Sequence, residues 1–196
     1  MFSEAELLLA GDRQVILTKD QIIEKVYERF GAISRQLHTV YMPIQKKYPH
    51  VFSMIPKISR GEKYRGMPWV MLDHPRCFAA SPGHFAQRTM FWWGHYFVAS
   101  AQFSGDHLKP MAEAIQKGIL PSRICGYPLH AGSPADIWEH QLPQQGIFPI
   151  DECNPFLFEK KGSTIKLAVS VPIANSHHID EVSVELGKLI TGVFSP

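Results

Sequence analysis

The chain has 196 residues, of which 45% are hydrophobic and 19% charged, values typical of a folded globular protein rather than a disordered one. Its formal net charge is only +2 at pH 7, whereas nucleic-acid-binding domains usually carry a clear basic excess, so no nucleic-acid partner is expected. This length suffices for one hydrophobic core, and we expect residues 1–196 to form a single domain.

The N-terminus and the cysteines favour a cytoplasmic protein without a membrane segment. The first residues are acidic where a secretory signal would be basic, and the apolar run over residues 91–103 is too short and too polar to cross a bilayer. The three cysteines are widely spaced and form no Cys-x-x-Cys pair. Neither a disulfide framework nor a zinc knuckle is therefore expected, which is consistent with a reducing compartment.

The N-terminal part of the chain carries the clearest helical pattern. Residues 3–6 form a capping box that predicts a short helix over residues 3–10, and a second box at residues 18–21 predicts the start of a long helix. Pro43 is expected to kink or end that helix. The apolar positions recur every three or four residues and form one stripe: Ile22, Val26, Phe30, Ile33, Leu37, Val40 and Ile44.

The centre of the chain predicts β-strands. We expect one strand over residues 67–72 and a longer β-rich run over residues 88–103. As a single straight strand the second run would extend for about 50 Å, so it needs a bend or bulge, and Gly94 is the natural position for it. Residues 164–171 alternate between apolar and smaller or polar side chains, which predicts the second arm of a hairpin with residues 156–160.

Between these strands lies a turn-rich segment, residues 119–155, which contains six prolines and is expected to form either a functional lid or a peripheral wrap. A last amphipathic helix follows from about residue 176. The sum is an α+β fold, with an antiparallel sheet of about four strands covered by the long N-terminal helix and the C-terminal helix.

Residues 88–98 are the most informative stretch for function, because they hold two of the four tryptophans. Strand alternation places Arg88, Trp92 and Tyr96 on one face and Phe91 and Trp93 on the other, provided that Gly94 does not shift it. The second face is expected to be core. The first mixes rings with polar groups, as ligand pockets do, although a face simply covered by helices is the competing interpretation.

We therefore predict a pocket for a small anionic or aromatic ligand. Aromatic faces would stack on the ligand, Arg88 would hold its charge, and the turn-rich segment would close over it. The candidate ligand-binding residues are Trp69, Asp73, Arg88, Trp92, His95 and Tyr96.

The alternative is a non-enzymatic interaction or assembly module whose exposed aromatic sheet face packs against a second copy of the chain. Aromatic residues and arginine are the side chains that interface hot spots prefer. The sequence leaves open which hypothesis holds and whether the protein is an enzyme. If it is one, His74, His84 or His95 is the expected acid or base, since the pKa of histidine lies near working pH.

No cofactor or metal is assigned from sequence. Ten histidines are about twice the usual number for this length, but no His-x-x-x-His pair or His-Glu-x-x-His motif occurs among them. The chain also lacks a Gly-x-Gly-x-x-Gly loop, a phosphate loop and a Gly-x-Ser-x-Gly elbow. We therefore predict no metal-binding residues.

Overall fold

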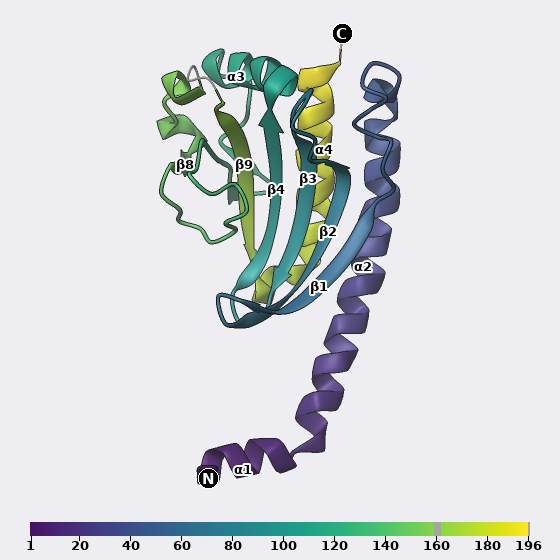
Figure 1. Cartoon of the computed structure of the whole chain (residues 1–196), viewed down its shortest axis with the longest axis vertical. Coiled ribbons are helices and arrows are strands. Elements are labelled where there is room, and N and C mark those ends of the chain that lie inside the picture. The colour runs from purple at the N-terminus through teal and green to yellow at the C-terminus, as the bar shows by residue number, and fades with distance from the viewer. Residues whose placement is uncertain (159–161, 196) are drawn as a thin grey trace.

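An antiparallel sheet backed on one face by two helices forms the body of the molecule (Figure 1). The computed structural model describes residues 1–158 and 162–195. Within those residues the sheet has seven strands in the order β1-β2-β3-β4-β9-β7-β8. The strands are β1 (Lys57–Tyr64), β2 (Met67–Cys77), β3 (Phe85–Trp92), β4 (Tyr96–Ser104), β7 (His130–Gly132), β8 (Ile147–Pro149) and β9 (Thr164–Pro172).

The remaining elements surround this sheet. The helices are α1 (Glu4–Gly11), α2 (Arg13–Gln45), α3 (Leu108–Gln116) and α4 (Ile179–Phe194). The 3-10 turns are η1 (Gly105–His107), η2 (Ile150–Glu152), η3 (Pro155–Phe158) and η4 (Ile173–His178), and β5 (Arg123–Ile124) pairs with β6 (Tyr127–Pro128) in a separate small hairpin. No helix within the described ranges is long and apolar enough to cross a membrane.

The α+β class is confirmed, but the expected count of about four strands is too small. The additional strands lie at the two edges of the sheet. The edge strand β1 is rich in charged side chains, which is how natural sheets protect an edge, so it shows no apolar alternation. At the other edge β7 and β8 have three residues each, too few to produce a pattern in sequence.

The long helix α2 begins earlier than predicted. Its N-cap is Asp12, whose side chain accepts a hydrogen bond from the Gln14 backbone N–H at 2.9 Å, so Thr18 lies inside the helix and does not cap it. Pro43 lies in the last turn, as expected. The buried stripe is Ile23, Val26, Phe30, Ile33, Leu37, Tyr41 and Ile44, while the predicted members Ile22 and Val40 are only half-buried.

The tryptophan-rich run forms a hairpin rather than one bent strand. β3 and β4 are joined by residues 93–95, and Gly94 adopts φ of 73°, a left-handed conformation that suits glycine. Trp92 pairs with Tyr96, so the predicted alternation survives the turn. Phe91 and Phe97 therefore face α2 and α4 in the main core, and the face carrying Arg88 points the opposite way.

The C-terminal strand is confirmed but its partner is not the predicted one. β9 pairs with β4 and β7, so it lies inside the sheet. The expected first arm of a hairpin is wrong over Pro155–Phe158, which form the 3-10 turn η3, and residues 159–160 fall outside the described part. Non-local pairing of this kind leaves no local sequence signal.

The helices α2 and α4 pack closely where α4 has a glycine. A Cβ atom at Gly187 would lie 2.8 Å from Leu37 Cδ2 and 3.2 Å from Gln87 Oε1. The Gln87 side chain is itself fixed, because Oε1 accepts from Tyr41 Oη at 2.5 Å and Nε2 donates to the Ser183 carbonyl at 2.7 Å. This position therefore has no room for a side chain.

Replacing Gly187 by valine should lower the free energy of unfolding by about 1–3 kcal/mol, since the added methyl groups would overpack a buried helix contact. Gly192 in the same helix is the matched control, because nothing lies within 4 Å of a Cβ atom built there. Thermal and denaturant unfolding would measure both variants. Equal stability of Gly187→Val and Gly192→Val would contradict the close contact.

Candidate functional site

The sheet face opposite the helices is crossed by the covering loop, residues 133–146, which connects β7 to β8. Gln102 Nε2 on β4 donates to the Ile137 carbonyl at 2.8 Å, and Lys166 Nζ on β9 donates to the same oxygen at 3.1 Å. Leu142 adds an apolar contact with a second buried cluster around Trp92. An irregular segment thus covers this face of the sheet, as α2 and α4 cover the other.

Two adjacent rows of side chains cross the covered face. Asp73, Arg88 and Ser100 lie opposite one another on β2, β3 and β4, and Gln102 lies opposite Lys166 in the next row. Directly opposed residues of antiparallel strands point to the same face, so these five polar side chains gather on one side of the sheet. This group is called the polar cluster.

Arg88 is the centre of the polar cluster. Its Nε donates to Asp73 Oδ1 at 2.7 Å, and its Nη1 lies 3.4 Å from His140 Nε2 of the covering loop. The guanidinium carbon lies 5.3 Å from the ring centroid of Phe78 and 5.0 Å from that of Trp138. A guanidinium has five N–H donors, so the pairing with Asp73 leaves donors for a further acceptor.

Lys166 is the second basic group of the polar cluster, and it has no carboxylate partner among the described residues. Within the described parts of the chain its hydrogen bonds go to backbone carbonyls, those of Ile137 and Glu139. Burial, reinforced by the charge of Arg88, lowers the pKa of Lys166 from 10.5 to about 7. The polar cluster itself therefore holds two basic side chains and one carboxylate, while Glu139 and Asp136 of the covering loop act on Lys166 without an ion pair.

Three buried polar atoms in this region have no hydrogen-bond partner among the described residues: Ser100 Oγ, Gln102 Oε1 and His140 Nδ1. Their residues are 1%, 0% and 4% exposed, so bulk water does not reach them. Burial, with the nearby charges of Lys166 and Arg88, lowers the pKa of His140 well below 6.5, so its ring is neutral. Buried polar atoms are nearly always paired with protein groups or ordered water, so these three atoms are positions where a further polar partner would fit.

The covering loop is fastened by two tyrosine hydroxyls. Tyr64 Oη accepts from the His140 backbone N–H at 2.7 Å and donates to the Glu139 carboxylate, while Tyr96 Oη accepts from the Leu142 backbone N–H at 2.6 Å. Burial raises the pKa of Tyr64 to about 12, with Glu139 adding to the shift. Burial alone would raise the pKa of Glu139, but hydrogen bonds from Arg65 and Tyr64 lower it to about 2.

The structure brings Asp73 and Arg88 together and separates them from the predicted rings. Trp92 is four residues along β3 from Arg88, about 13 Å at 3.3 Å per residue. It is 2% exposed, and Trp69 lies opposite it in the same apolar cluster. His95 lies exposed in the turn, where its ring stacks on Trp92 with centroids 3.6 Å apart. Tyr96 contributes through its hydroxyl, which holds the covering loop.

The three candidate acid–base histidines lie in three different places. His74 points to the helix side, where its Nδ1 lies 2.9 Å from Ser34 Oγ, and burial lowers its pKa to about 4. His95 is exposed in the β3–β4 turn. Only His84 borders the covered face, with its ring 6.3 Å from that of Trp138, and burial lowers its pKa.

Sequence reasoning missed Lys166 and His140. The alternation of residues 164–171 does place Lys166 on the face of β9 away from the helices, and that face was expected to be wetter. Lys166 is nevertheless 1% exposed, because the covering loop lies over it. A lysine at the centre of an apolar strand is the signal that could have drawn attention to it; His140 has no comparable local signal.

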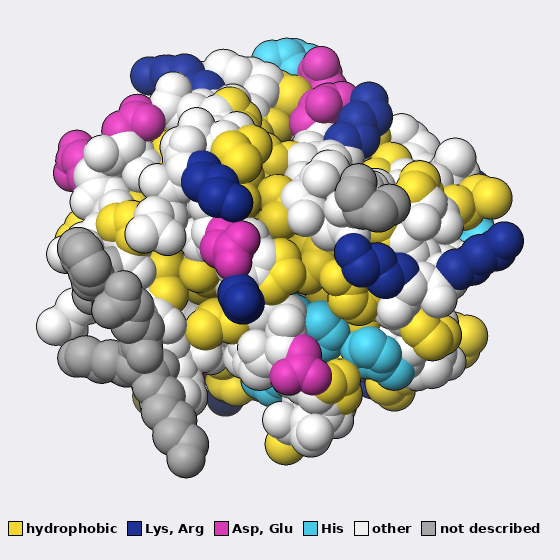
Figure 2. Space-filling model, turned by 90° about the horizontal axis from the view of Figure 1, so that it is seen from above, with side chains coloured by type: hydrophobic (Ala, Val, Ile, Leu, Met, Phe, Trp, Pro, Cys, Tyr) yellow, Lys and Arg dark blue, Asp and Glu magenta, His cyan; other side chains and the backbone are white. Residues whose placement is uncertain are grey.

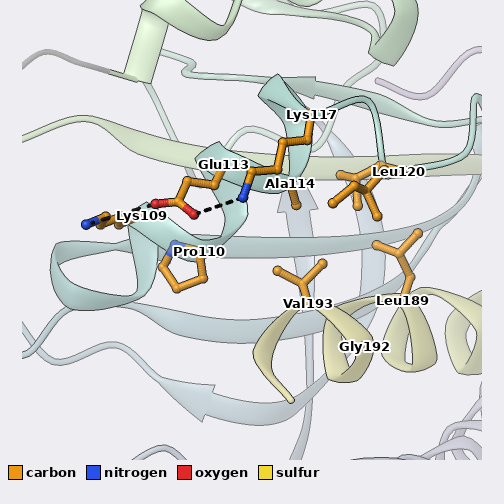
Figure 3. Close-up of a pocket in the computed structure, with 10 residues that line it drawn as sticks. Lys109, Pro110, Glu113, Ala114, Lys117, Leu120, Leu189, Gly192 and Val193 are labelled. Atoms are coloured by element: carbon orange, nitrogen blue, oxygen red, sulfur yellow. Dashed lines mark hydrogen bonds and ion pairs between the residues drawn. The ribbon is translucent and has the colours of Figure 1, made fainter. Parts of the chain in front are cut away.

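A groove of about 630 Å³ lies elsewhere, between α3 and α4. Figure 3 shows its apolar floor, formed by Ala114, Leu120, Leu189 and Val193, and an ion pair at its rim between Lys117 and Glu113, 3.5 Å apart. Figure 2 looks onto this end of the molecule, where hydrophobic side chains are exposed between charged ones. The charged residues of its lining, Lys109, Glu113 and Lys117, pair with one another at the rim.

Histidines also gather near this end of the molecule (Figure 2). His50 and His107 stack, with their Nε2 atoms 3.0 Å apart, and His107 Nδ1 lies 3.1 Å from the His84 carbonyl. Across residues 1–158 and 162–195, no three His, Cys, Asp or Glu side chains are grouped to hold a metal ion. The pair therefore packs as a hydrogen-bonded contact.

The comparisons with known proteins give no relative from which a role could be transferred. No family model, no curated protein and no solved structure matches the chain. The case for a site therefore rests on the geometry of the polar cluster.

The titration of Lys166 should appear in the pH dependence of stability. The unfolded chain binds this proton up to about pH 10.5 and the folded chain only up to about pH 7, so stability should rise with pH between these values. Lys166→Met should flatten the slope between pH 7 and 9.5, measured by denaturant unfolding. Lys109→Met, at an exposed lysine, is the control and should retain the wild-type slope.

Removing the Tyr64 hydroxyl should loosen the covering loop. Tyr64→Phe leaves the His140 backbone N–H without its acceptor, a loss of about 1–3 kcal/mol for a buried group, and amide hydrogen exchange over residues 137–142 should accelerate by about tenfold or more. Tyr127→Phe removes a hydroxyl bonded to His178 and is the matched control. Unchanged exchange in the loop of Tyr64→Phe would show that Tyr64 does not hold it.

Proposed function

We propose that the chain binds a small carboxylate carrying an aromatic or apolar group, between the sheet face and the covering loop. The observation that carries this proposal is the buried pair of basic residues, Arg88 and Lys166, which face one carboxylate and are surrounded by unpaired polar atoms. The proposal keeps Asp73 and Arg88 from the predicted set and gives Trp69, Trp92 and His95 supporting positions at the apolar end of the same face.

The charges of the polar cluster support an anionic ligand. Arg88 and Asp73 form an ion pair whose side chains are 12% and 10% exposed, so their charges largely cancel. Lys166 forms no ion pair among the described residues: Glu139 is already paired with Arg65, and Asp136 acts on Lys166 only through a weaker electrostatic interaction. A carboxylate that accepts from Arg88 and Lys166 would supply the missing negative charge and charge-assisted hydrogen bonds in a site shielded from water.

The rings around Arg88 support a flat or apolar ligand body. Phe78 and Trp138 both contact its guanidinium, and they lie 5.3 Å apart with an interplanar angle of 58°. On the other side the apolar cluster supplies Met71, Met90 and Val98. Ligand pockets typically combine a few convergent polar groups with such apolar walls.

Entry requires the covering loop to move, since the polar cluster is closed in this structure. The loop is held mainly by hydrogen bonds, and Trp138 at its centre is 46% exposed. Segments with few buried apolar contacts open at low free-energy cost, which suits a loop that admits a ligand. The loop then acts as a lid whose own carbonyls occupy Lys166 until the ligand arrives.

Calorimetric titration with benzoate tests this proposal, with inorganic phosphate as a small anion that lacks a ring. We expect benzoate to bind more tightly than phosphate, and more tightly below pH 7 than above it, because the ligand stabilises the protonated form of Lys166 and binding takes up a proton. Lys166→Met should weaken benzoate binding by about tenfold or more, the scale of one charge-assisted hydrogen bond.

Arg88 cannot be tested by a single substitution, because Arg88→Gln alone would leave the Asp73 carboxylate buried without a partner and could prevent folding. The double variant Asp73→Asn/Arg88→Gln removes both charges and should fold yet lose benzoate. Arg76→Gln, at a β2 arginine outside the polar cluster, is the matched control. If benzoate fails to bind at millimolar concentrations, or binds the double variant as well as wild type, the proposed function is wrong.

A further inference from the structure

The N-terminal arm, residues 1–18, is exposed at every position and carries a dense set of apolar side chains. Figure 1 shows α1 and the first turns of α2 projecting away from the sheet. Among the most exposed residues are Phe2 at 70%, Leu7 at 58%, Leu8 at 71% and Leu9 at 62%, and α1 buries none of its residues. Apolar surface gathered in this way on a folded chain marks an interaction site.

A matching apolar groove of about 500 Å³ lies where α2 meets the body of the molecule. α2 contributes Ile22, Lys25 and Val26 to its lining, the β3–β4 hairpin contributes Trp93, and η4 contributes Ile173. It is a surface separate from the polar cluster, because it lies on the helix side of the sheet. Trp93, which was expected to be a core residue, thus also borders a groove.

The charges of the arm and the groove are complementary. α1 contains two acids, Glu4 and Glu6, and no basic residue. At the groove Arg29 is already occupied, since its Nε donates to Asp180 Oδ1 at 2.5 Å and its Nη2 to the His177 carbonyl at 2.9 Å. Lys25 has no ion pair within the described parts of the chain, so it can receive an acid from outside.

The helix α1 of the same chain is too short to reach its own groove. A helix rises 1.5 Å per residue, so α1 is about 12 Å long, while about 14 Å of α2 separates Arg13 from Ile22, where the groove begins. Folded back at Asp12, α1 would cover Val15, Ile16 and Leu17 and end just before the groove, so only residues 1–3 could extend over its edge. An arm from a second molecule has no such limit.

We infer that the chain forms a twofold dimer in which the N-terminal arm of each copy docks in the α2–hairpin–η4 groove of the other. Arm exchange between identical chains is a low-cost route to dimers, and the twofold axis makes both contacts at once. The helix α1 is apolar on more than one side; it docks Ala5, Leu8 and Leu9, which lie at helical spacing, and its acids meet Lys25 at the rim. A membrane surface is disfavoured as the occupant, because interfacial helices usually carry lysine and arginine and α1 has neither.

Sedimentation velocity of the full chain at micromolar concentration tests this inference. We expect the wild-type protein to have the mass of two chains. The double variant Leu8→Asp/Leu9→Asp should raise the dissociation constant of the dimer by at least about tenfold. The control Ile55→Asp/Ile119→Asp changes two equally exposed apolar residues elsewhere and should remain dimeric. The thermal stability of the isolated subunit should not change, since α1 contributes nothing to the core.

The groove is tested separately with Ile173→Asp, which changes an exposed lining residue. This variant should also be monomeric, and mixing it with Leu8→Asp/Leu9→Asp should restore a mixed dimer, because one intact arm then meets one intact groove. A monomeric wild type, an Ile173→Asp variant that still dimerises, or a monomer that binds phosphatidylglycerol vesicles through the arm would each overturn the inference. None of these outcomes depends on benzoate binding, so the two proposals stand or fall separately.

Discussion

The arrangement of the molecule depends on the fact that two helices cover only one face of its sheet. The opposite face carries large apolar side chains, among them Trp92 and Met90, which must also be removed from water. An irregular loop performs that task, and a loop brings unpaired backbone groups with it. Gln102 and Lys166 donate to its carbonyls and two tyrosine hydroxyls accept from its amides, so much of the polar chemistry on this face follows from the choice of cover.

The need to cover this sheet face with a loop accounts for some of the polar side chains on it but not for others. Lys166 is explained in part, as a donor to the covering loop. The Ser100 hydroxyl and the Gln102 carbonyl oxygen, which have no hydrogen-bond partner among the described residues, take no part in holding the loop, whereas the contact of Arg88 with His140 also joins the sheet to the loop. Buried polar atoms are nearly always paired, so the need to cover the sheet does not account for these two atoms, and the ligand of the proposed function is one way to pair them.

The parts of the fold that sequence could predict are those with a local period. The α2 stripe, β9 and the two faces of the tryptophan hairpin follow from side-chain spacing, and Gly94 preserved the alternation because it closes a tight turn between paired strands. The start of α2 was misplaced because its first turns are exposed and lack the apolar stripe. The polar cluster could not be assembled in advance, since Lys166 and His140 reach Arg88 only through long-range pairing and the path of one loop.

The strand order has a consequence for the way this sheet can come apart. β1 to β4 follow one another in the chain and pair in that order, forming a meander built from near-neighbour contacts. β9 closes onto it, and the three-residue strands β7 and β8 form the far edge, joined to the rest only through β9. The covering loop joins these two short strands, so that edge can detach as a local unit only if the loop also releases its hydrogen bonds to Tyr64, Tyr96 and Gln102 of the meander.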